Sequence, residues 1–362
     1  MRLGVNEVIR ADVYDVISDK NIPWNELRDS TVLVTGATGL IGGALVRALS
    51  SAKAEYNLNT RLIGHGRNRD KGEALAQEFG LEFFGGDIRK PPLIADVTDR
   101  LDYVFHCAAI TKSADMVAKP VDVVTTMVDG TLNMLELARK KLCRSFVYLS
   151  SMEIYGQTEL SEVSERDLGR LDLSNPRSSY PESKRFCESL CIAHAAQYSF
   201  PVKIARLART FGAGTPNDEN DMRVANQFAR KALTNEDIEL HTEGNSIANC
   251  CYTSDSIRGL LTVLLKGKDG EAYNIANPDA SATVREMAEL VANEVCGGRI
   301  NVVLNVPEDL KTRGYAPNVG YTLNANKLKA LGWTPKYGLD EMYLRMLADW
   351  QELSWLTAEN NK

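Results

Sequence analysis

A tyrosine and a lysine four residues apart are the residues of this sequence with the clearest chemical use. Tyr180 and Lys184 would lie on one face of a helix, because residues i and i+4 are neighbours on a helix surface. A free phenol has a pKa of about 10 and is a poor base near neutrality, but a nearby ammonium group favours the phenolate. Ser151, roughly thirty residues earlier, can bring a hydroxyl to the same place. The three residues predict an acid–base site that takes a proton from a substrate hydroxyl.

A glycine-rich turn near the N-terminus predicts a dinucleotide site. Gly36, Gly39 and Gly42 have the spacing GxxGxxG, directly after an apolar run and directly before a helical pattern. The first glycine allows a tight turn, the second lets backbone approach a pyrophosphate, and the third packs helix on strand. The N–H groups and the dipole of the helix would then hold the phosphates. The cofactor residues expected here and at later strand ends are Gly36, Thr38, Gly39, Leu40, Ile41, Gly42, Arg67, Asp87, Ile88, Ala108 and Ala109.

The residues after the second predicted strand bear on the choice between NAD and NADP. NAD usually requires a carboxylate there to bind the ribose hydroxyls. Residues 64–69 contain no carboxylate and two arginines, Arg67 and Arg69. A 2′-phosphate would suit that charge, so NADP is slightly favoured. The alternative is that both arginines are surface charges and that NAD binds.

Alternating strand and helix patterns must position these residues. They predict an α/β fold, a Rossmann-type doubly wound parallel sheet with a smaller, discontinuous C-terminal substrate lobe. Strands are expected at 31–34, 61–64, 81–84, 103–107, 146–149, 202–205 and 271–276, and helices at 40–49, 70–79, 121–141 and 180–198. After Arg206 the alternation weakens into helical and loop segments, and a further helix begins near Ser254 or Asp255 as its cap.

The same patterns divide the chain. We expect an N-terminal arm over residues 1–30. The NAD(P)-binding domain is expected over residues 31–205 plus about 250–278, and the substrate-binding lobe over about 206–249 plus 279–362.

Composition excludes several classes of function. The 362 residues carry a net charge of −6, and an acidic protein has no general attraction for nucleic acid or anionic membranes. The N-terminal residues show no apolar core of signal-peptide length, and no apolar run is long enough to cross a membrane, so a cytoplasmic protein is expected. The seven cysteines lack metal-ligand spacing and are expected to be reduced, buried thiols, with no metal site.

The motifs together resemble the extended short-chain dehydrogenase/reductases, in particular the NAD(P)-dependent nucleotide-sugar epimerase/dehydratase family. The resemblance covers residues 31–333 and implies that TGxxGxxG binds the cofactor. It implies that Tyr180 is the general base and that Lys184 lowers the pKa of Tyr180 and holds the nicotinamide ribose, so that both residues also contact the cofactor. Ser151, four residues before Tyr155, would position the substrate hydroxyl. The implied reaction is transient oxidation of a sugar at C4, followed by epimerisation, dehydration or decarboxylation.

Glu153 bears on which of these reactions follows. In the dehydratases and decarboxylases that the segment resembles, the corresponding glutamate acts as a base or helps the substrate react after oxidation. Once C4 is a ketone, the C5 proton is acidic and a carboxylate beside it can remove it. Met152 stands where one type of dehydratase has an aspartic acid, so that acid is missing here. The alternative is that Glu153 only contacts a sugar hydroxyl.

Three further segments are similar to the UDP-glucuronate decarboxylase branch of the family. They surround Arg177, Arg206 and Arg223. The resemblance implies that they contact a nucleotide-diphosphate sugar, through Arg177, Arg209, Arg223 and Gln227. The sequence also departs from that branch. Arg209 replaces an asparagine, Ala248 replaces an arginine, and the arginine that meets the substrate carboxylate has no clear match, although Arg313 is near. Glucuronate is therefore not assured as the sugar.

Two alternative functions are considered, and a homodimer is expected. The chain could be an NADP-dependent keto-sugar reductase with net cofactor turnover, or a non-catalytic sensor that keeps the nucleotide fold. Retention of Ser151, Tyr180 and Lys184 argues against the sensor. The helices 121–141 and 180–198 carry apolar residues beyond one face, and in the family such helices pair in a homodimer. These residues include Leu132, Leu135, Phe186, Leu190 and Ile192.

Overall fold

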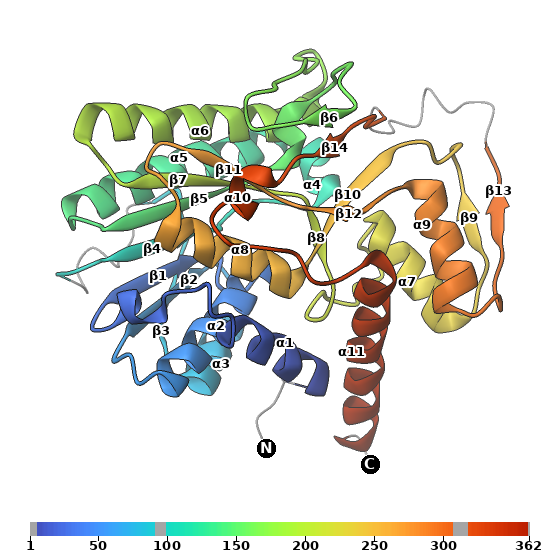
Figure 1. Ribbon diagram of the computed structural model, residues 1–362, viewed down its shortest axis with the longest axis horizontal. Coiled ribbons are helices and arrows are strands. Elements are labelled where there is room, and N and C mark those ends of the chain that lie inside the picture. Colours follow the sequence, from blue (N-terminus) through green and yellow to red (C-terminus); the bar gives the residue numbers. More distant parts are fainter. Residues whose placement is uncertain (1–5, 91–98, 307–317, 361–362) are drawn as a thin grey trace.

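A seven-stranded parallel sheet forms the centre of the molecule (Figure 1). The computed structural model describes residues 6–90, 99–306 and 318–360. The strand order is β11-β7-β5-β4-β1-β2-β3, so that both neighbours of β1 are reached by crossovers. The strands are β1 (Thr31–Thr35), β2 (Arg61–Gly66), β3 (Glu82–Gly85), β4 (Tyr103–His106), β5 (Ser145–Ser151), β7 (Val202–Leu207) and β11 (Ala272–Ile275). This confirms the predicted doubly wound α/β fold.

Helices cover both faces of this sheet, as the alternation of its side chains requires. Leu33 packs into the core on the α5 and α6 side, whereas its neighbours Val32 and Val34 pack into the core on the α2 and α8 side. Figure 1 shows α5 and α6 above the sheet and α2, α3 and α8 below it. The helices are α2 (Leu40–Glu55), α3 (Arg69–Phe79), α4 (Ser113–Ala118), α5 (Pro120–Lys140), α6 (Ser179–Tyr198), α8 (Thr253–Lys266) and α10 (Asn326–Lys329).

A second, smaller core lies beside the sheet and contains strands that the sequence patterns did not predict. A three-stranded sheet has the order β12-β10-β8, and β9 pairs with β13. The strands are β8 (Arg209–Phe211), β9 (Ile238–Leu240), β10 (Ile247–Tyr252), β12 (Asn277–Thr283) and β13 (Val302–Leu304). They pack with α7 (Val224–Thr234), α9 (Val284–Leu290), the π-helical turn Val291–Val295 and α11 (Leu339–Asn360). The sequence predicted mainly helices and loops after Arg206, but the structure also has five strands of the smaller core there.

Short elements line the junction between the two cores. A two-stranded sheet joins β6 (Glu162–Val163) to β14 (Thr322–Leu323). The 3₁₀ turn η3 (Met152–Tyr155) follows β5, and η4 (Pro176–Ser178) directly precedes α6. The segment between these two turns leaves the sheet and returns at the start of α6, so it carries residues to the carboxyl end of β5.

The described part of the predicted arm contains a helix, α1 (Glu7–Ile17), and the turn η1 (Trp24–Leu27). Asn6 caps α1 and also donates through Nδ2 to the Asp349 carboxylate of α11. Arg345 of α11 pairs with Asp12 of α1, and Tyr252 donates to the same carboxylate. Helix α1 is therefore tied to the C-terminal helix by buried polar contacts.

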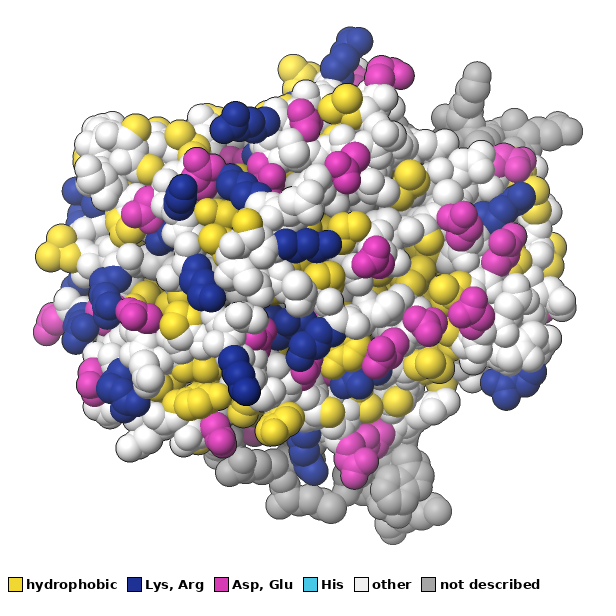
Figure 2. Space-filling model, in the orientation of Figure 1, with side chains coloured by type: hydrophobic (Ala, Val, Ile, Leu, Met, Phe, Trp, Pro, Cys, Tyr) yellow, Lys and Arg dark blue, Asp and Glu magenta, His cyan; other side chains and the backbone are white. Residues whose placement is uncertain are grey.

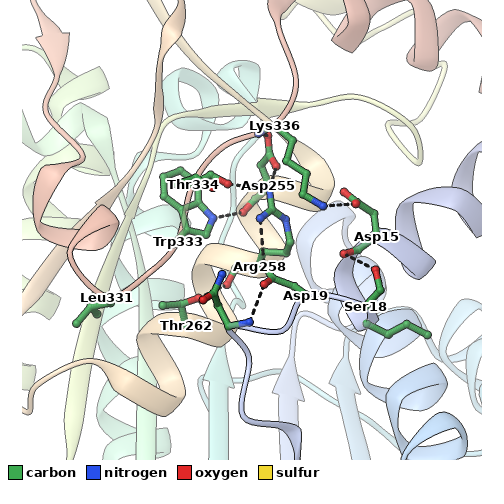
Figure 3. A network of polar contacts seen from close by, with 12 residues as sticks. Asp15, Ser18, Asp19, Asp255, Arg258, Thr262, Leu331, Trp333, Thr334 and Lys336 are labelled. Atoms are coloured by element: carbon green, nitrogen blue, oxygen red, sulfur yellow. Dashed lines mark hydrogen bonds and ion pairs between the residues drawn. The ribbon is translucent and has the colours of Figure 1, made fainter.

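A second group of polar contacts joins the end of α1 to α8 (Figure 3). Arg258 pairs with Asp19 at 3.1 Å and with Asp255, and it donates to the Thr334 carbonyl at 2.9 Å. Asp255 also accepts the backbone N–H of Lys336 at 2.9 Å. Helix α8 begins at Thr253, and Tyr252 is its N-cap residue. The expectation that Ser254 or Asp255 caps this helix is therefore wrong. The Asp255 side chain is used by the later segment instead.

The cysteines and the surface agree with a globular protein without covalent cross-links. All seven cysteines are free, and six of them are buried. Within the described residues, no helix is long and apolar enough to cross a membrane. Figure 2 shows acidic and basic side chains interspersed over the face seen in Figure 1.

Candidate active site

The glycine-rich turn lies where the strand order reverses, between β1 and β4. Gly36 has a φ of +66°, and a Cβ there would lie 3.1 Å from the backbone of Ala108 at the end of β4. A Cβ on Gly42 would lie 2.2 Å from the Gly36 carbonyl oxygen, so α2 packs directly on the turn. Glycine leaves the backbone room that any side chain would fill, and a crevice at such a switch point is where dinucleotides bind in this kind of sheet. These residues fit a dinucleotide.

Hydrogen bonds fix the end of β4 beside this turn. Thr35 Oγ1 accepts the N–H of Ala108 at 3.1 Å and contacts His106 Nδ1 at 2.9 Å. His106 Nε2 lies 3.2 Å from Thr131 Oγ1 of α5. Burial lowers the pKa of His106 to about 3, so the ring is neutral. It links Thr35 of β1 to Thr131 of α5 through its two ring nitrogens. Ala108 and Ala109 follow with small side chains, as the sequence indicated.

The charged residues predicted for the cofactor lie at the ends of β2 and β3. Arg67 is exposed after β2, and the Arg69 side chain lies along Gly85 at the end of β3. Asp87 is paired with Arg89 at 2.6 Å, and this hydrogen bond holds the pKa of Asp87 below its ordinary value. The expected contact of Asp87 with the cofactor would therefore have to compete with Arg89.

The tyrosine and lysine lie in the first turns of α6, as their spacing predicted. The side chains of Tyr180 and Lys184 are both buried. Lys184 Nζ donates to the Leu149 carbonyl at 2.5 Å and lies 5.9 Å from the centre of the Tyr180 ring. Burial lowers the pKa of Lys184 to about 8. The lysine is thus held beneath the tyrosine by the strand β5, with a pKa close to neutrality.

The surroundings of Tyr180 disfavour its phenolate. Burial raises its pKa well above the ordinary value, and the nearby carboxylate of Glu153 raises it further. A hydrogen bond with Ser151 and the positive charge of Arg177 act in the opposite direction. Ser151 and Tyr180 line the same cavity, and Lys184 lies behind the tyrosine, which brings together the three residues proposed from the sequence.

Two arginines hold α6 against the turn that carries Ser151. Arg185 donates to the carbonyls of Ile154 and Gly169, both at 2.8 Å. Arg206 of β7 forms a buried ion pair with Glu188 at 2.7 Å and donates to the Tyr155 hydroxyl at 3.0 Å. The sequence did not predict which residues these two arginines contact, because each contact joins elements that are separate along the chain.

Glu153 and Arg177 form an ion pair next to Tyr180. Arg177 Nη2 donates to the two carboxylate oxygens of Glu153 at 3.0 and 2.7 Å. The guanidinium carbon of Arg177 lies 5.7 Å from the centre of the Tyr180 ring. The carboxylate of Glu153, which the sequence analysis singled out, is thus held by the guanidinium of Arg177, three residues before Tyr180.

A cavity of about 620 Å³ opens above these groups. Six of the residues predicted for catalysis or substrate binding line it: Ser151, Glu153, Arg177, Tyr180, Arg209 and Arg223. Lys184 lies beneath the lining, and Gln227 is turned to the Met222 carbonyl at 2.6 Å. Arg223 pairs with Asp221. Arg313 lies outside the described residues.

The structure adds lining residues that sequence reasoning missed. Arg170 comes from the excursion between η3 and η4, and Tyr321 from the segment before β14. Neither segment has a periodic pattern, so only the folded chain places them at the cavity. In the described part of the chain, no group of three or more His, Cys, Asp or Glu side chains could hold a metal ion.

Comparisons with known proteins agree with this geometry. The sequence model of the NAD dependent epimerase/dehydratase family matches residues 32–276. UDP-glucuronic acid decarboxylase 3 of Arabidopsis thaliana is 30% identical over 314 residues, which are 86% of this chain and 86% of that protein. UDP-glucuronic acid decarboxylase 1 of Xenopus tropicalis is 29% identical over 312 residues, 86% of this chain and 69% of that protein.

Solved structures share the fold. UDP-glucose 4-epimerase of Thermotoga maritima, solved with UDP-glucose, superposes with a TM-score of 0.76 at 24% identity, over 90% of this chain and 99% of that chain. UDP-glucuronic acid 4-epimerase of Bacillus cereus, in complex with UDP-glucuronic acid and NAD, gives a TM-score of 0.72 at 22% identity, over 89% of this chain and 99% of that chain.

Proposed function

The chain belongs to the NAD dependent epimerase/dehydratase family, and from that premise we propose that it modifies a nucleotide-diphosphate sugar. The sugar would be oxidised at C4 with bound NAD(P), then epimerised, dehydrated or decarboxylated, and reduced again. The names of the similar proteins support this, since they act on or bind UDP-glucose and UDP-glucuronic acid.

The observation that carries the proposal is the convergence of Ser151, Tyr180 and Lys184 at one cavity. Ser151 and Tyr180 both line it, and Lys184 Nζ lies 5.9 Å from the centre of the Tyr180 ring. The volume of about 620 Å³ lies within the range of small-molecule sites. A sensor that had lost the chemistry would have no need of this arrangement.

Each of these residues has a defined task. Ser151 orients the sugar hydroxyl toward Tyr180, and Tyr180 takes its proton. Because burial and Glu153 raise the pKa of Tyr180, the phenolate that this step requires would depend on the Lys184 ammonium together with the cationic nicotinamide ring of bound NAD(P). Bound NAD(P) supplies the hydride acceptor, and the backbone of the turn at Gly36 and Gly39 would hold its pyrophosphate.

Glu153 would carry a proton in the second stage. Its carboxylate lines the cavity beside Tyr180, where a C5 proton of an oxidised sugar could be reached. A 4-epimerase has no need of such a base, because its keto-sugar only turns over and is reduced on the other face. Glu153 therefore favours dehydration over 4-epimerisation. In a decarboxylation the C5–C6 bond would break and CO₂ would leave, so the same group would instead return a proton to C5.

We assign NADP as the slightly favoured form of the cofactor. Arg67 is exposed directly after β2, Arg69 follows it, and residues 64–69 offer no carboxylate for a ribose hydroxyl. A keto-sugar reductase would use the same residues and would release its reduced or oxidised cofactor at each turnover. Cofactor retained through purification would separate the two functions.

A homodimer and a reducing compartment complete the proposal. Leu132, Phe186 and Ile192 on α5 and α6 are 42%, 52% and 42% exposed, so they form an apolar surface that a second copy could cover. Leu135 was expected there too, but it is fully buried in the core under α5. The free cysteines support a cytoplasmic location.

The test is a mass-spectrometric analysis of the cofactor that copurifies with the protein, with a screen of UDP-, dTDP-, GDP- and CDP-sugars for turnover. Thermal stabilisation by NADP should exceed that by NAD if Arg67 binds a phosphate. A parent protein that neither cofactor stabilises, and that converts no nucleotide sugar, would refute the proposed function.

A further inference from the structure

The ammonium of Lys184 is buried without a carboxylate in direct contact. Lys184 is 4% exposed, and the hydrogen bond that Nζ makes with the described residues goes to the neutral carbonyl of Leu149 at 2.5 Å. Glu188, one turn further along α6, is bound to Arg206 instead. A buried charge is costly unless other groups compensate it, so a further group must favour the ammonium.

The aromatic ring of Tyr148 lies against this ammonium. Tyr148 belongs to β5 and is 2% exposed, and the centre of its ring is 4.9 Å from Lys184 Nζ. The ring of Tyr180 is farther away, at 5.9 Å. The face of an aromatic ring attracts a cation within about 6 Å, and the attraction is strongest where water is excluded, as it is here. The Tyr148 hydroxyl has no hydrogen-bond partner among the described residues, so the ring is what this side chain offers.

The other titratable groups around Lys184 are uncharged near neutral pH. Burial raises the pKa of both tyrosines and of the three neighbouring thiols, and it lowers the pKa of the neighbouring imidazole to about 3. The thiols and the imidazole belong to Cys187, Cys191, Cys107 and His106. The carboxylate of Glu188 is also near, but Arg206 pairs with it. A change of charge in this cluster above neutral pH therefore belongs to Lys184.

A neutral ring suits the task of this lysine better than a carboxylate would. A carboxylate in contact with Nζ would stabilise the ammonium, but its negative charge would cancel the field that the ammonium exerts on Tyr180. The Tyr148 ring and the Leu149 carbonyl carry no net charge. They favour the ammonium and leave its positive field available to a phenolate.

We propose that Tyr148 is a positioning residue of the reaction, whose ring keeps Lys184 in the ammonium form through a cation–π contact and so sustains the proton transfer at Tyr180. Tyr148 does not line the cavity, so it acts on the substrate only through Lys184. The inference rests on the proposed function for what the ammonium does. The contact itself can be tested without turnover.

The first experiment measures the pKa of Lys184 by NMR in the full-length protein with isotopically labelled lysine, with Lys184→Met to assign the signal. The pKa in the parent should lie near 8, because burial lowers it. Tyr148→Leu and the more voluminous Tyr148→Met both remove the ring, and each should lower that pKa by about 1 to 1.5, the size of a cation–π contact without water. Tyr148→Phe keeps the ring and should leave the pKa close to that of the parent.

The second experiment follows kcat/KM against pH for the same variants, with a nucleotide sugar that the parent converts. Activity is lost as the ammonium loses its proton, so a lower pKa moves this loss to lower pH. The alkaline limb should begin about 1 to 1.5 pH units lower in Tyr148→Leu and Tyr148→Met, and Tyr148→Phe should restore the parent profile.

The matched control is Phe146→Leu, which removes a ring from the same face of β5. Phe146 is fully buried, and its ring centre lies 6.0 Å from that of His106, as does the ring centre of Tyr148. Among the described residues no cation lies over the Phe146 ring, so the variant should lower stability without moving the pKa of Lys184.

Two outcomes would overturn the proposal. If the variants without the Tyr148 ring leave the pKa of Lys184 unchanged, or if Phe146→Leu moves it equally, Tyr148 only fills space. Neither result would affect the proposed function. If the pKa moves as expected but the parent converts no nucleotide sugar, the proposed function is refuted and the role of Tyr148 in a reaction with it, although the contact with Lys184 stands.

Discussion

Replacing Arg258 by methionine should remove the centre of the polar group that joins α1, α8 and the segment after α10 (Figure 3). The arginine side chain is 2% exposed, and its partners Asp19 and Asp255 are 8% and 0% exposed. Methionine fills much of the volume but carries no charge, so two buried carboxylates lose their common cation. The carbonyl of Thr334 also loses a hydrogen bond of 2.9 Å.

The expected loss follows from this burial. Removing one partner of a buried ion pair costs about 3–5 kcal/mol, because the other charge stays in a medium of low polarity. With an unfolding entropy of about 2.1 cal/mol/K per residue, the chain of 362 residues should melt about 4–7 °C lower. Burial already raises the pKa of Asp255 and Arg258 opposes that rise. In the variant the folded-state pKa rises further, so the deficit should grow as the pH increases through that pKa.

The assay is urea and thermal unfolding at pH 5.5 and 7.5, followed by tryptophan fluorescence and circular dichroism. Trp333 is a local reporter, because its Nε1 donates to the Asp255 carbonyl at 2.9 Å. The control is Arg285→Met, in an exposed pair with Glu243 whose side chains are 43% and 61% exposed; it should cost no more than about 1 kcal/mol. A loss for Arg258→Met as small as the control's would refute the reasoning.

Four further predictions concern the site. Tyr180→Phe should abolish even the first hydride transfer, so no reduced cofactor should appear at 340 nm when substrate is added; a normal burst of absorbance would remove Tyr180 from the reaction. Glu153→Gln should allow that burst but slow overall turnover about 10²–10⁴-fold, with a stalled keto-sugar detectable by mass spectrometry; near-normal turnover would favour a 4-epimerase. Because burial lowers the pKa of Lys184 to about 8, its ammonium is lost above that pH, and kcat/KM should fall on the alkaline side; a flat profile to pH 10 would contradict this. Gly42→Ala places a methyl group 2.2 Å from the Gly36 carbonyl and should abolish thermal stabilisation by NAD(P) while the protein remains folded by circular dichroism.

The sheet was predictable because each of its units carries its own local signal. The apolar runs at 31–34 and 202–205, for example, each lie within a strand of the structure. The smaller core was not predictable in this way. Its strand β10 pairs with β8 and with β12, joining Cys250 to Arg209 and to Asn277 across the chain. Short strands whose partners are so distant leave no pattern in the sequence.

The site shows the same division. The spacing of Tyr180 and Lys184 predicted their common face, and the structure places both on α6, with Ser151 and Tyr180 at the same cavity. Nothing in the sequence indicated that Glu153 would meet Arg177, because that contact depends on how η4 returns the chain to the cavity. The roles of all these residues stay predictions.

The contact of α1 with α11 has a consequence for the order in which the protein can fold. Asn6 meets Asp349, which lies 343 residues later, and Arg345 meets Asp12. At a synthesis rate of about 5–20 residues per second, the first helix emerges about 20–70 seconds before its partner has been made. During that interval its apolar face can pack only on α2, which follows it closely, and later on α8. The Rossmann half can therefore assemble on the ribosome, whereas the polar contacts of α1 with α11 form only after α11 has been made.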